Sequence, residues 1–523
     1  MAIDYIFGAN ILENLTTGMY PDSRVIYREY IQNACDAIDQ AIEEGVLNPG
    51  EGSIAIWQNK DDRTVSIEDD GIGIKAKDFV RVLGNIADSD KKVGEDKGFR
   101  GIGRLCGLAY CETLVFTTSF KGENTISVMT CDAKLMRAML DENVRGIKHE
   151  AKTVLNAINS FDSRVTDDAD SHFFKVELID INKENRDLLD LPLVKDYLSF
   201  VAPVQYQNQF IYRREVSSYA VELGVPIDVY SISLNGETIL KHYTADLRDS
   251  SGNKDDEVFD IEFRVFNDSE NRLLAWLWFG LTQFRKQIVK STNPMRSIRL
   301  RKDNIQIGGE DTLQKLFKED RGNSYFIGEV FAVSESLVPN SQRDYFNESP
   351  VRLEFEEKLK EFFNDELYQL YYAGSKINSQ YKKVAAYNTK SNEYQKKHRE
   401  GAFVDSQHRE KEMQELNDAH EKARKAKEVI LRSVATPKSE TIGKVFERIE
   451  KQQSILEIEE ESHQEQQGGP SEPRLAQPRR VDRLSRYSKQ DRKLISRIYS
   501  VIASNLDSVT AEELIEKIEE ELS

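Results

Sequence analysis

The stretch EDKGFRGIGRLCGLAY, residues 95–110, decides how the first part of the chain is interpreted, because four glycines fall within ten of its positions. Glycine-rich loops of this kind let the backbone approach phosphate groups closely. A dinucleotide-binding loop should follow a buried strand directly, yet the preceding residues 85–97, NIADSDKKVGEDK, are polar and charged. The phosphate-loop pattern G-x-x-x-x-G-K-[ST] does not occur in the chain. These glycines therefore have to be interpreted from the sequence around them.

The segment upstream predicts an amphipathic helix over residues 22–45, with apolar residues at helical spacing and Gly45 as a stop. Glu29 and Asn33 lie one turn apart on this helix, with Asp36 near the same face. A carboxylate can orient and deprotonate a water molecule, and an amide oxygen suits the oxygen shell of Mg²⁺. In isolation, such a pair is more simply explained as an ordinary solvated face.

A second candidate element, IEDDGIGI (67–74), ends a hairpin predicted from the alternating runs at 52–58 and 63–69. Asp69 stands at the strand tip, where a carboxylate can accept a hydrogen bond from an exocyclic amine such as that of adenine. Gly71 and Gly73 permit turn geometry or close approach of a flat ligand. A plain turn is the alternative, because D-D-G is good turn chemistry.

In the third element, Gly98, Gly101 and Gly103 precede a helix predicted to begin near Arg104. Backbone N–H groups at a helix start offer an anion site, and the polar residues before it can form a mobile lid. The alternative is a flexible loop. The loop interpretation is less favoured because all three elements occur in this order within about eighty residues.

Together the elements resemble the GHKL ATPase superfamily of gyrase, heat-shock chaperones, histidine kinases and MutL. The resemblance to HtpG-type chaperones lies in REYIQNACDAIDQ (28–40), DDGIGIKAKDFVRVLGNIADSD (69–90) and GFRGIG (98–103). It implies ATP and Mg²⁺ as cofactors, and a lid over residues 84–104. By position, the implied roles are general base for Glu29, Mg²⁺ ligand for Asn33, adenine-binding carboxylate for Asp69, adenine pocket for Gly71 and Gly73, and triphosphate loop for Gly98, Gly101 and Gly103.

Three arginines are further candidates for phosphate contact. The loop ESLVPNSQRDYF (335–346) resembles the catalytic loop of the chaperones' middle domain, which implies that Arg343 stabilises charge on the γ-phosphate. A surface-loop arginine is an equally good interpretation. Arg100 and Arg104 flank the glycines, although the chaperone pattern has no arginine at either position.

The expected fold class is α+β with several domains, as the length of 523 residues requires. A Bergerat-type α/β sandwich with an antiparallel or mixed sheet is expected at 1–182, and a transducer-like α/β domain at 183–372. Trp276 and Trp278 lie in an alternating run and are expected in a core or interface. The sequence after about residue 372 has no recognisable counterpart in the chaperones. It is expected to form a long helical or coiled-coil segment (373–465), a flexible linker (466–480) and a small helical docking or dimerisation module (481–523).

Composition narrows the range of possible functions and locations. A formal charge of −18 disfavours general affinity for nucleic acid or anionic membranes. No apolar run is long enough to span a membrane and no secretion signal is present, so a cytosolic protein is expected. The four cysteines form no C-x-x-C pair and are expected to be small buried hydrophobes.

Two functions remain in competition. One is an HtpG-like ATPase whose lid closure and homodimerisation act on a protein client. The other is a MutL- or MORC-like ATPase that engages DNA in repair, chromosome handling or defence against phage, favoured by the basic stretches 285–302 and 474–497. Ion-paired faces are the simpler explanation of those stretches. A histidine kinase is disfavoured, because such kinases place a phosphoacceptor-histidine helical pair before the ATP domain.

Overall fold

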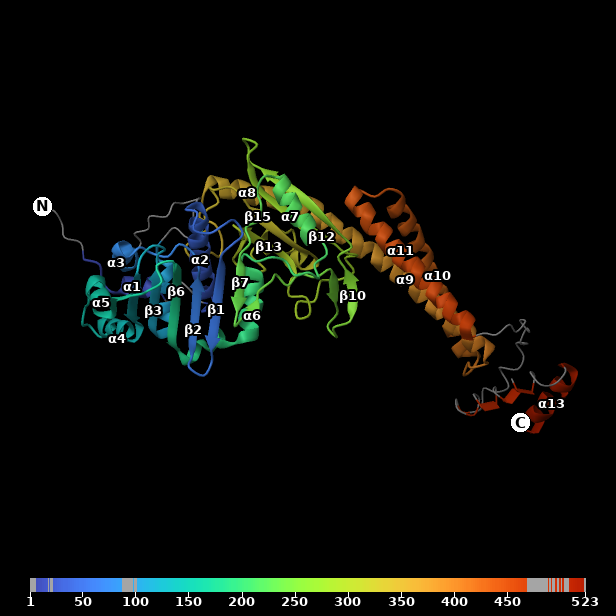
Figure 1. Ribbon diagram of the computed structural model, residues 1–523. Helices are drawn as coiled ribbons and strands as arrows, with labels where there is room; N and C mark the ends of the chain where they lie inside the picture. Colours follow the sequence, from blue (N-terminus) through green and yellow to red (C-terminus); the bar gives the residue numbers. More distant parts are fainter. Residues whose placement is uncertain are drawn as a thin grey trace. The chain divides into compact units, whose positions relative to one another are not determined.

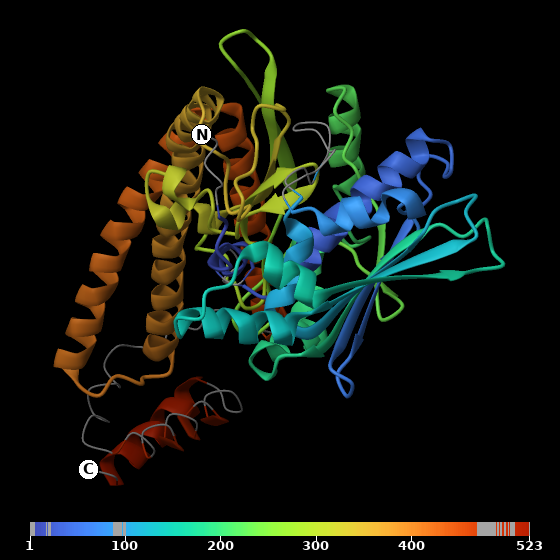
Figure 2. The ribbon, with the colours of Figure 1, turned by 90° about the vertical axis from the view of Figure 1, so that its left-hand side faces the viewer.

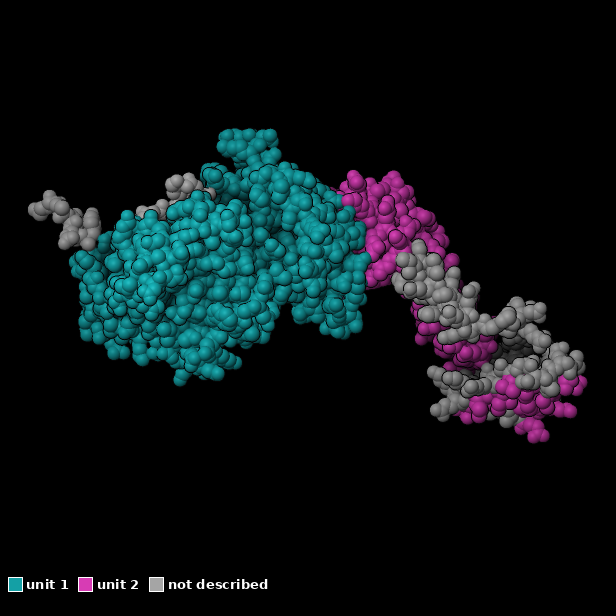
Figure 3. Space-filling model, viewed as in Figure 1, with its two compact units in different colours: residues 1–282, 287–368 teal, residues 283–286, 369–523 magenta. Residues whose placement is uncertain are grey.

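The computed structural model describes residues 6–16, 18, 22–86, 97, 101–467, 488, 491, 494–495, 498–499, 501–502 and 508–521. The chain forms two compact units (Figure 3). The first comprises residues 1–282 and 287–368, and the second comprises 283–286 and 369–523. No helix among the described residues is long and apolar enough to cross a membrane.

An eight-stranded sheet organises the N-terminal part of the first unit, in the order β5-β4-β3-β6-β2-β1-β7-β8. All its strand pairs are antiparallel except β1 with β7, which are parallel. The predicted hairpin is confirmed as β1 paired with β2. The strands are β1 (Ser53–Asn59), β2 (Thr64–Asp69), β3 (Cys111–Ser119), β4 (Thr125–Asp132), β5 (Asn159–Val165), β6 (Phe173–Ile181), β7 (Ser231–Leu234) and β8 (Glu237–Thr238).

Helices cover one face of this sheet, with α2 lying across it (Figures 1 and 2). Alternation along β1 turns Ile54 and Ile56 into the core beneath α2, while Trp57 stays 53% exposed on the other face. The free cysteines are all buried, as expected. The helical elements are α1 (Asn10–Leu15), α2 (Val25–Glu43), α3 (Ala76–Gly84), η1 (Gly103–Ala109), α4 (Ala133–Val144), α5 (Ala151–Ile158), η2 (Lys183–Leu189), α6 (Leu191–Val201) and α7 (Arg213–Glu222).

The helix predicted near Arg104 is a 3-10 helix of seven residues, η1. The hydroxyl of Tyr30 donates a hydrogen bond to the Arg104 carbonyl at 3.0 Å and accepts one from the Gly107 amide at 3.1 Å. These backbone groups thereby pair with a side chain of α2, and glycine at 103 and 107 lowers the α-helical propensity further. The helix expected after the glycines is therefore present from Gly103, as a short 3-10 helix.

A five-stranded sheet of order β11-β12-β15-β13-β14 forms the second lobe of the first unit, beside a two-stranded β9–β10 ribbon. Trp276 and Trp278 on β12 are at most 1% exposed, so the predicted core role is confirmed. The elements are β9 (Asp246–Arg248), β10 (Lys254–Glu257), β11 (Asp260–Asn267), β12 (Leu273–Leu281), β13 (Ser297–Lys302), β14 (Ile305–Ile307), η3 (Gln314–Leu316), η4 (Asp320–Tyr325), β15 (Ile327–Ala332), α8 (Pro350–Phe362) and the π-helical turn η5 (Phe363–Leu367).

The second unit contains the long helices α9 (Tyr368–Arg399, whose first residue belongs to the first unit), α10 (Ser406–Ala435) and α11 (Glu440–Gln467). Residues 283–286 join it because the Asn378 side chain of α9 donates to the Gln283 carbonyl at 2.6 Å. A short helix, α13 (Ser508–Glu521), lies near the C-terminus. The predicted linker falls almost wholly outside the described residues.

Candidate active site

Helix α2 carries the acidic residues of the candidate site on one face. Glu29 and Asp36 are 8% and 7% exposed, and Asn33 between them is partly exposed. η1 approaches this face so closely that a Cβ added at Gly103 would lie 2.6 Å from Glu29 Oε2. The structure thus brings Glu29 and Gly103 together, although the sequence separates them by more than seventy positions.

Two guanidinium groups flank the Glu29 carboxylate. Its Oε1 lies 3.4 Å from Arg28 Nη2 and 3.9 Å from Arg343 Nε, and each of these three side chains is at most 10% exposed. Burial lowers the pKa of Arg343, and Glu29 opposes this shift. Two guanidinium groups thus lie against one buried carboxylate, and Asp303 and Asp36 add further negative charge near Arg343.

The loop that carries Arg343 is held against α2. Arg28 Nη2 donates to the Gln342 carbonyl at 2.9 Å, and the Arg343 carbonyl accepts from the Gly308 amide at 2.8 Å. The Arg343 guanidinium donates to the Lys97 carbonyl. Arg343 is only 7% exposed, so the interpretation as a surface arginine is wrong.

Asp69, the last residue of β2, is 4% exposed and lies beside α2. Asp69 Oδ1 accepts from the Gly71 amide at 3.0 Å. A Cβ at Gly71 would lie 2.7 Å from the Ala37 carbonyl carbon, and one at Gly73, where φ is +69°, would lie 2.0 Å from the Ser119 carbonyl oxygen. Both glycines are therefore required for packing alone, whatever ligand the turn approaches.

Of the remaining glycine and arginine candidates, the structure describes Gly101 and Arg104. Gly98 and Arg100 lie outside the described residues, as does most of the expected lid. Gly101 has a φ of +66°, a conformation that glycine adopts without strain. The Arg104 guanidinium donates to the Asn85 carbonyl after α3, and burial lowers its pKa. Arg104 is thus engaged with the end of α3.

The basic stretch 285–302 is buried in its second half, from residue 297 to 302. Arg301 is fully buried and Arg299 is 5% exposed. Lys290, Arg296 and Arg299 all pair with Glu310, at 2.7, 3.5 and 3.6 Å. These contacts favour the ion-paired interpretation over a nucleic-acid patch.

Sequence reasoning missed Lys97, Asp39, Asp228 and Tyr230, which gather beside the site. No local sequence pattern identifies these residues. Lys97 belongs to a run of ordinary polar residues and contacts its partners only in the folded chain. Arg28 could have been proposed from the sequence as a site residue, because it directly precedes Glu29.

Residues 23–164 match the family model of histidine kinase-, DNA gyrase B- and HSP90-like ATPases. The match bears out the resemblance of this part of the chain to the GHKL superfamily, which the motifs indicated.

Several curated relatives are named chaperone protein HtpG. The protein of Buchnera aphidicola subsp. Baizongia pistaciae is 25% identical over 240 residues, which covers 42% of this chain and 31% of the relative. That of Methylorubrum populi is 33% identical over 108 residues, 18% and 17% of the two chains. That of Halalkalibacterium halodurans is 29% identical over 131 residues, 22% and 21%. The match thus spans about a third or less of each relative.

Proposed function

We propose that the chain is a Mg²⁺-dependent ATPase of the HtpG-like class, which uses ATP-driven lid closure and homodimerisation to hold or remodel a protein partner. The observation that carries the proposal is the buried Glu29 carboxylate between Arg28 and Arg343. Glu29 lies on α2, within the residues that match the ATPase family model. The names of the relatives support the chaperone-like part.

In the proposed reaction, Glu29 orients the attacking water and accepts its proton, while Arg343 stabilises charge developing on the transferred phosphoryl group. Asp69 accepts a hydrogen bond from the adenine amine, and its buried position excludes competing water. Glu29 has to leave its cationic neighbours in part to serve as a base. We therefore expect slow turnover, gated by conformational change.

The residues present fit a magnesium ion. Mg²⁺ takes few protein oxygens and completes its shell with water and phosphate oxygens. The partly exposed Asn33 supplies an amide oxygen one turn from Glu29. Bound there with ATP, the ion would neutralise phosphate charge.

The first test compares wild type with Glu29→Gln, which keeps the size of the side chain and removes the base. We expect nucleotide binding to persist while Mg²⁺-dependent hydrolysis falls by about 100-fold or more. Glu68→Gln, on the exposed face of β2, is the matched control and should hydrolyse ATP as wild type does. A wild type that binds no nucleotide would refute the proposal. Stimulation of hydrolysis by duplex DNA would favour the MutL- or MORC-like alternative instead.

A further inference from the structure

Lys97 contacts three separate parts of the first unit. Its amide donates to Asp36 Oδ1 at 2.8 Å, and its ammonium donates to Asp39 Oδ2 at 2.6 Å, so both ends of the residue are bound to α2. The same ammonium lies 3.3 Å from Asp228 Oδ2, in the segment between α7 and β7. Its carbonyl accepts the hydrogen bond from the Arg343 guanidinium.

The ammonium of Lys97 remains charged in this setting. Its side chain is 9% exposed, and burial alone would lower its pKa. Tyr230, Asp228 and Asp39 outweigh that effect and raise the pKa above its ordinary value. The Tyr230 ring centroid lies 5.4 Å from Nζ, and the Tyr230 hydroxyl donates to Asp39 at 2.7 Å. The cation therefore joins two carboxylates and an aromatic ring from different elements.

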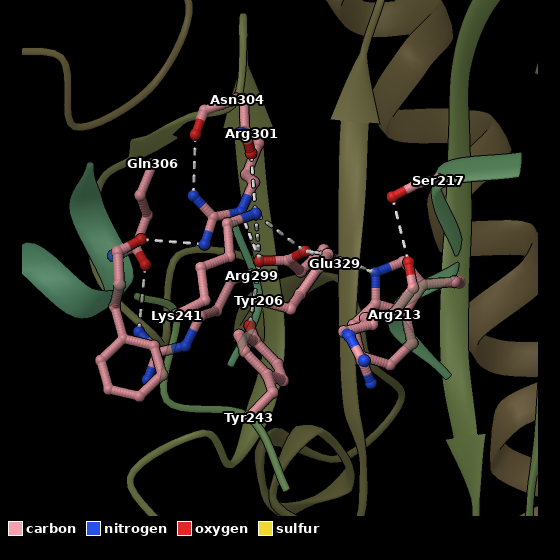
Figure 4. Close-up of polar contacts among 12 residues, drawn as sticks. Tyr206, Arg213, Ser217, Lys241, Tyr243, Arg299, Arg301, Asn304, Gln306 and Glu329 are labelled. Carbon is pink, nitrogen blue, oxygen red and sulfur yellow. Dashed lines mark hydrogen bonds and ion pairs between the residues drawn. The ribbon is translucent and has the colours of Figure 1, made fainter. Parts of the chain in front are cut away.

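One partner of Lys97, Asp228, is in turn hydrogen-bonded to the second lobe. The Asp228 carbonyl accepts from Asn304 Nδ2 at 2.6 Å, and Asn304 Oδ1 accepts from Lys241 Nζ at 2.7 Å. Figure 4 shows that Lys241 belongs to a polar cluster around Glu329. Glu329 is 0% exposed and pairs with both Lys241 and Arg301. Asp228 is thus held by a fully buried network, whereas its carboxylate is about half exposed.

We propose that Lys97 is a positioning residue for ATP hydrolysis, which ties α2 to the second lobe and holds Arg343 beside Glu29. This inference rests on the function proposed above. Lys97 acts through its carbonyl on Arg343, while its amide and ammonium determine where that carbonyl lies. Loss of the side chain removes the contacts to Asp39 and Asp228 together, so Arg343 loses the acceptor that keeps it near the carboxylate.

The test measures ATP affinity and single-turnover hydrolysis for wild type, Lys97→Met, Lys97→Arg and Asp228→Asn. We expect Lys97→Met to lower the hydrolysis rate by about 10- to 100-fold with ATP affinity changed less than about threefold, because misplacing a catalytic group by about 1 Å costs this much. Lys97→Arg should recover most of the rate. Asp228→Asn should lower it in the same direction, and serves if Lys97→Met does not fold.

A double-mutant cycle separates positioning from general destabilisation. If Lys97 acts through Arg343, then Lys97→Met should cost little further rate in an Arg343→Ala background. Lys195→Met breaks an exposed ion pair with Glu237 in the same unit, and is the control that should hydrolyse ATP as wild type does.

The outcomes distinguish the two proposals. Wild-type turnover with an unchanged Lys97→Met rate, or fully additive effects in the cycle, would overturn the role of Lys97 and leave the ATPase standing. A wild type that binds and hydrolyses no ATP would overturn both.

Discussion

Gly103 sets the distance between η1 and the carboxylate on which the proposed chemistry depends. No side chain fits there without displacing Glu29, because an added Cβ would lie 2.6 Å from its Oε2. The atom it would meet is the end of a flexible side chain, so a substitution should move the carboxylate more than it disturbs the fold. Gly73 differs, since its added Cβ would meet the backbone oxygen of Ser119.

We predict that Gly103→Ala lowers the rate of ATP hydrolysis by about tenfold or more, while the free energy of unfolding changes by less than about 1 kcal/mol. Single-turnover hydrolysis and urea denaturation measure the two effects. Gly443→Ala, in α11, is the control, because its Cβ would lie an ordinary 3.5 Å from Pro437. A variant that keeps the wild-type rate would show that the Glu29 carboxylate need not stay where η1 places it.

The candidate site was predictable from sequence where its geometry is local. Helical spacing alone puts Glu29, Asn33 and Asp36 on one face, and the structure has them there. The approach of Arg343 to Glu29 was suggested only by a family resemblance, since no spacing rule connects residues more than three hundred positions apart. The contacts of Lys97 had no local signal at all, because they depend on the folded positions of three other segments.

At the scale of elements, the alternating runs predicted the strands, whereas contacts between elements distant in the sequence were not predicted. The β1–β2 hairpin follows from period-two alternation. The helix expected near Arg104 is present as η1, but the sequence did not specify its 3-10 geometry, in which Tyr30 of another helix bonds two of its backbone groups. The parallel pairing of β7 with β1 joins segments about 180 positions apart, so sequence could place β7 only in the second region.

The buried cluster around Lys241 and Glu329 leads to a prediction about how folding stability depends on pH. Burial, and then the neighbouring Arg301, lower the pKa of Lys241 from 10.5 to about 7, although Glu329 opposes them. Tyr206 and Tyr243 also face the ammonium, and burial raises the pKa of each. Between pH 7 and 10 the unfolded chain therefore binds a proton at Lys241 that the folded chain has released. Folding stability rises with pH across that window.

Comparison with Lys241→Met isolates this contribution. The stability of wild type relative to Lys241→Met should increase by about 2 kcal/mol from pH 7 to pH 9, because the variant lacks the titrating group. Urea denaturation followed by tryptophan fluorescence measures it. Parallel pH profiles for the two proteins would mean that Glu329 keeps Lys241 charged throughout.

At the scale of the whole molecule, the division into units departs from what composition suggests. The polar, helix-favouring sequence after about residue 372 lies within the second unit, which also contains residues 283–286. Residues 283–286 join that unit through the Asn378 contact across 95 positions, and no shift in composition marks them. Periodicity identifies helices, but the partners of a four-residue segment emerge only from tertiary packing.

The distribution of tryptophan allows each unit to be followed separately. All three tryptophans, Trp57, Trp276 and Trp278, lie in the first unit, whereas the long helices α9–α11 belong almost entirely to the second. Tryptophan fluorescence therefore reports unfolding of the first unit, and far-UV circular dichroism adds the helical unit.

If ATP binds where we propose, a non-hydrolysable ATP analogue with Mg²⁺ should stabilise the first unit. At a concentration of about 100 times its Kd, the gain should be about 2.7 kcal/mol. We expect the fluorescence transition to move to higher temperature while the part of the dichroism transition due to α9–α11 stays in place. Asp69→Asn keeps an oxygen that can accept from the Gly71 amide, and its fluorescence transition should no longer respond at this analogue concentration. A dichroism transition that moves as a whole would contradict the prediction, because it would mean that nucleotide stabilises the helical unit as strongly as the first unit.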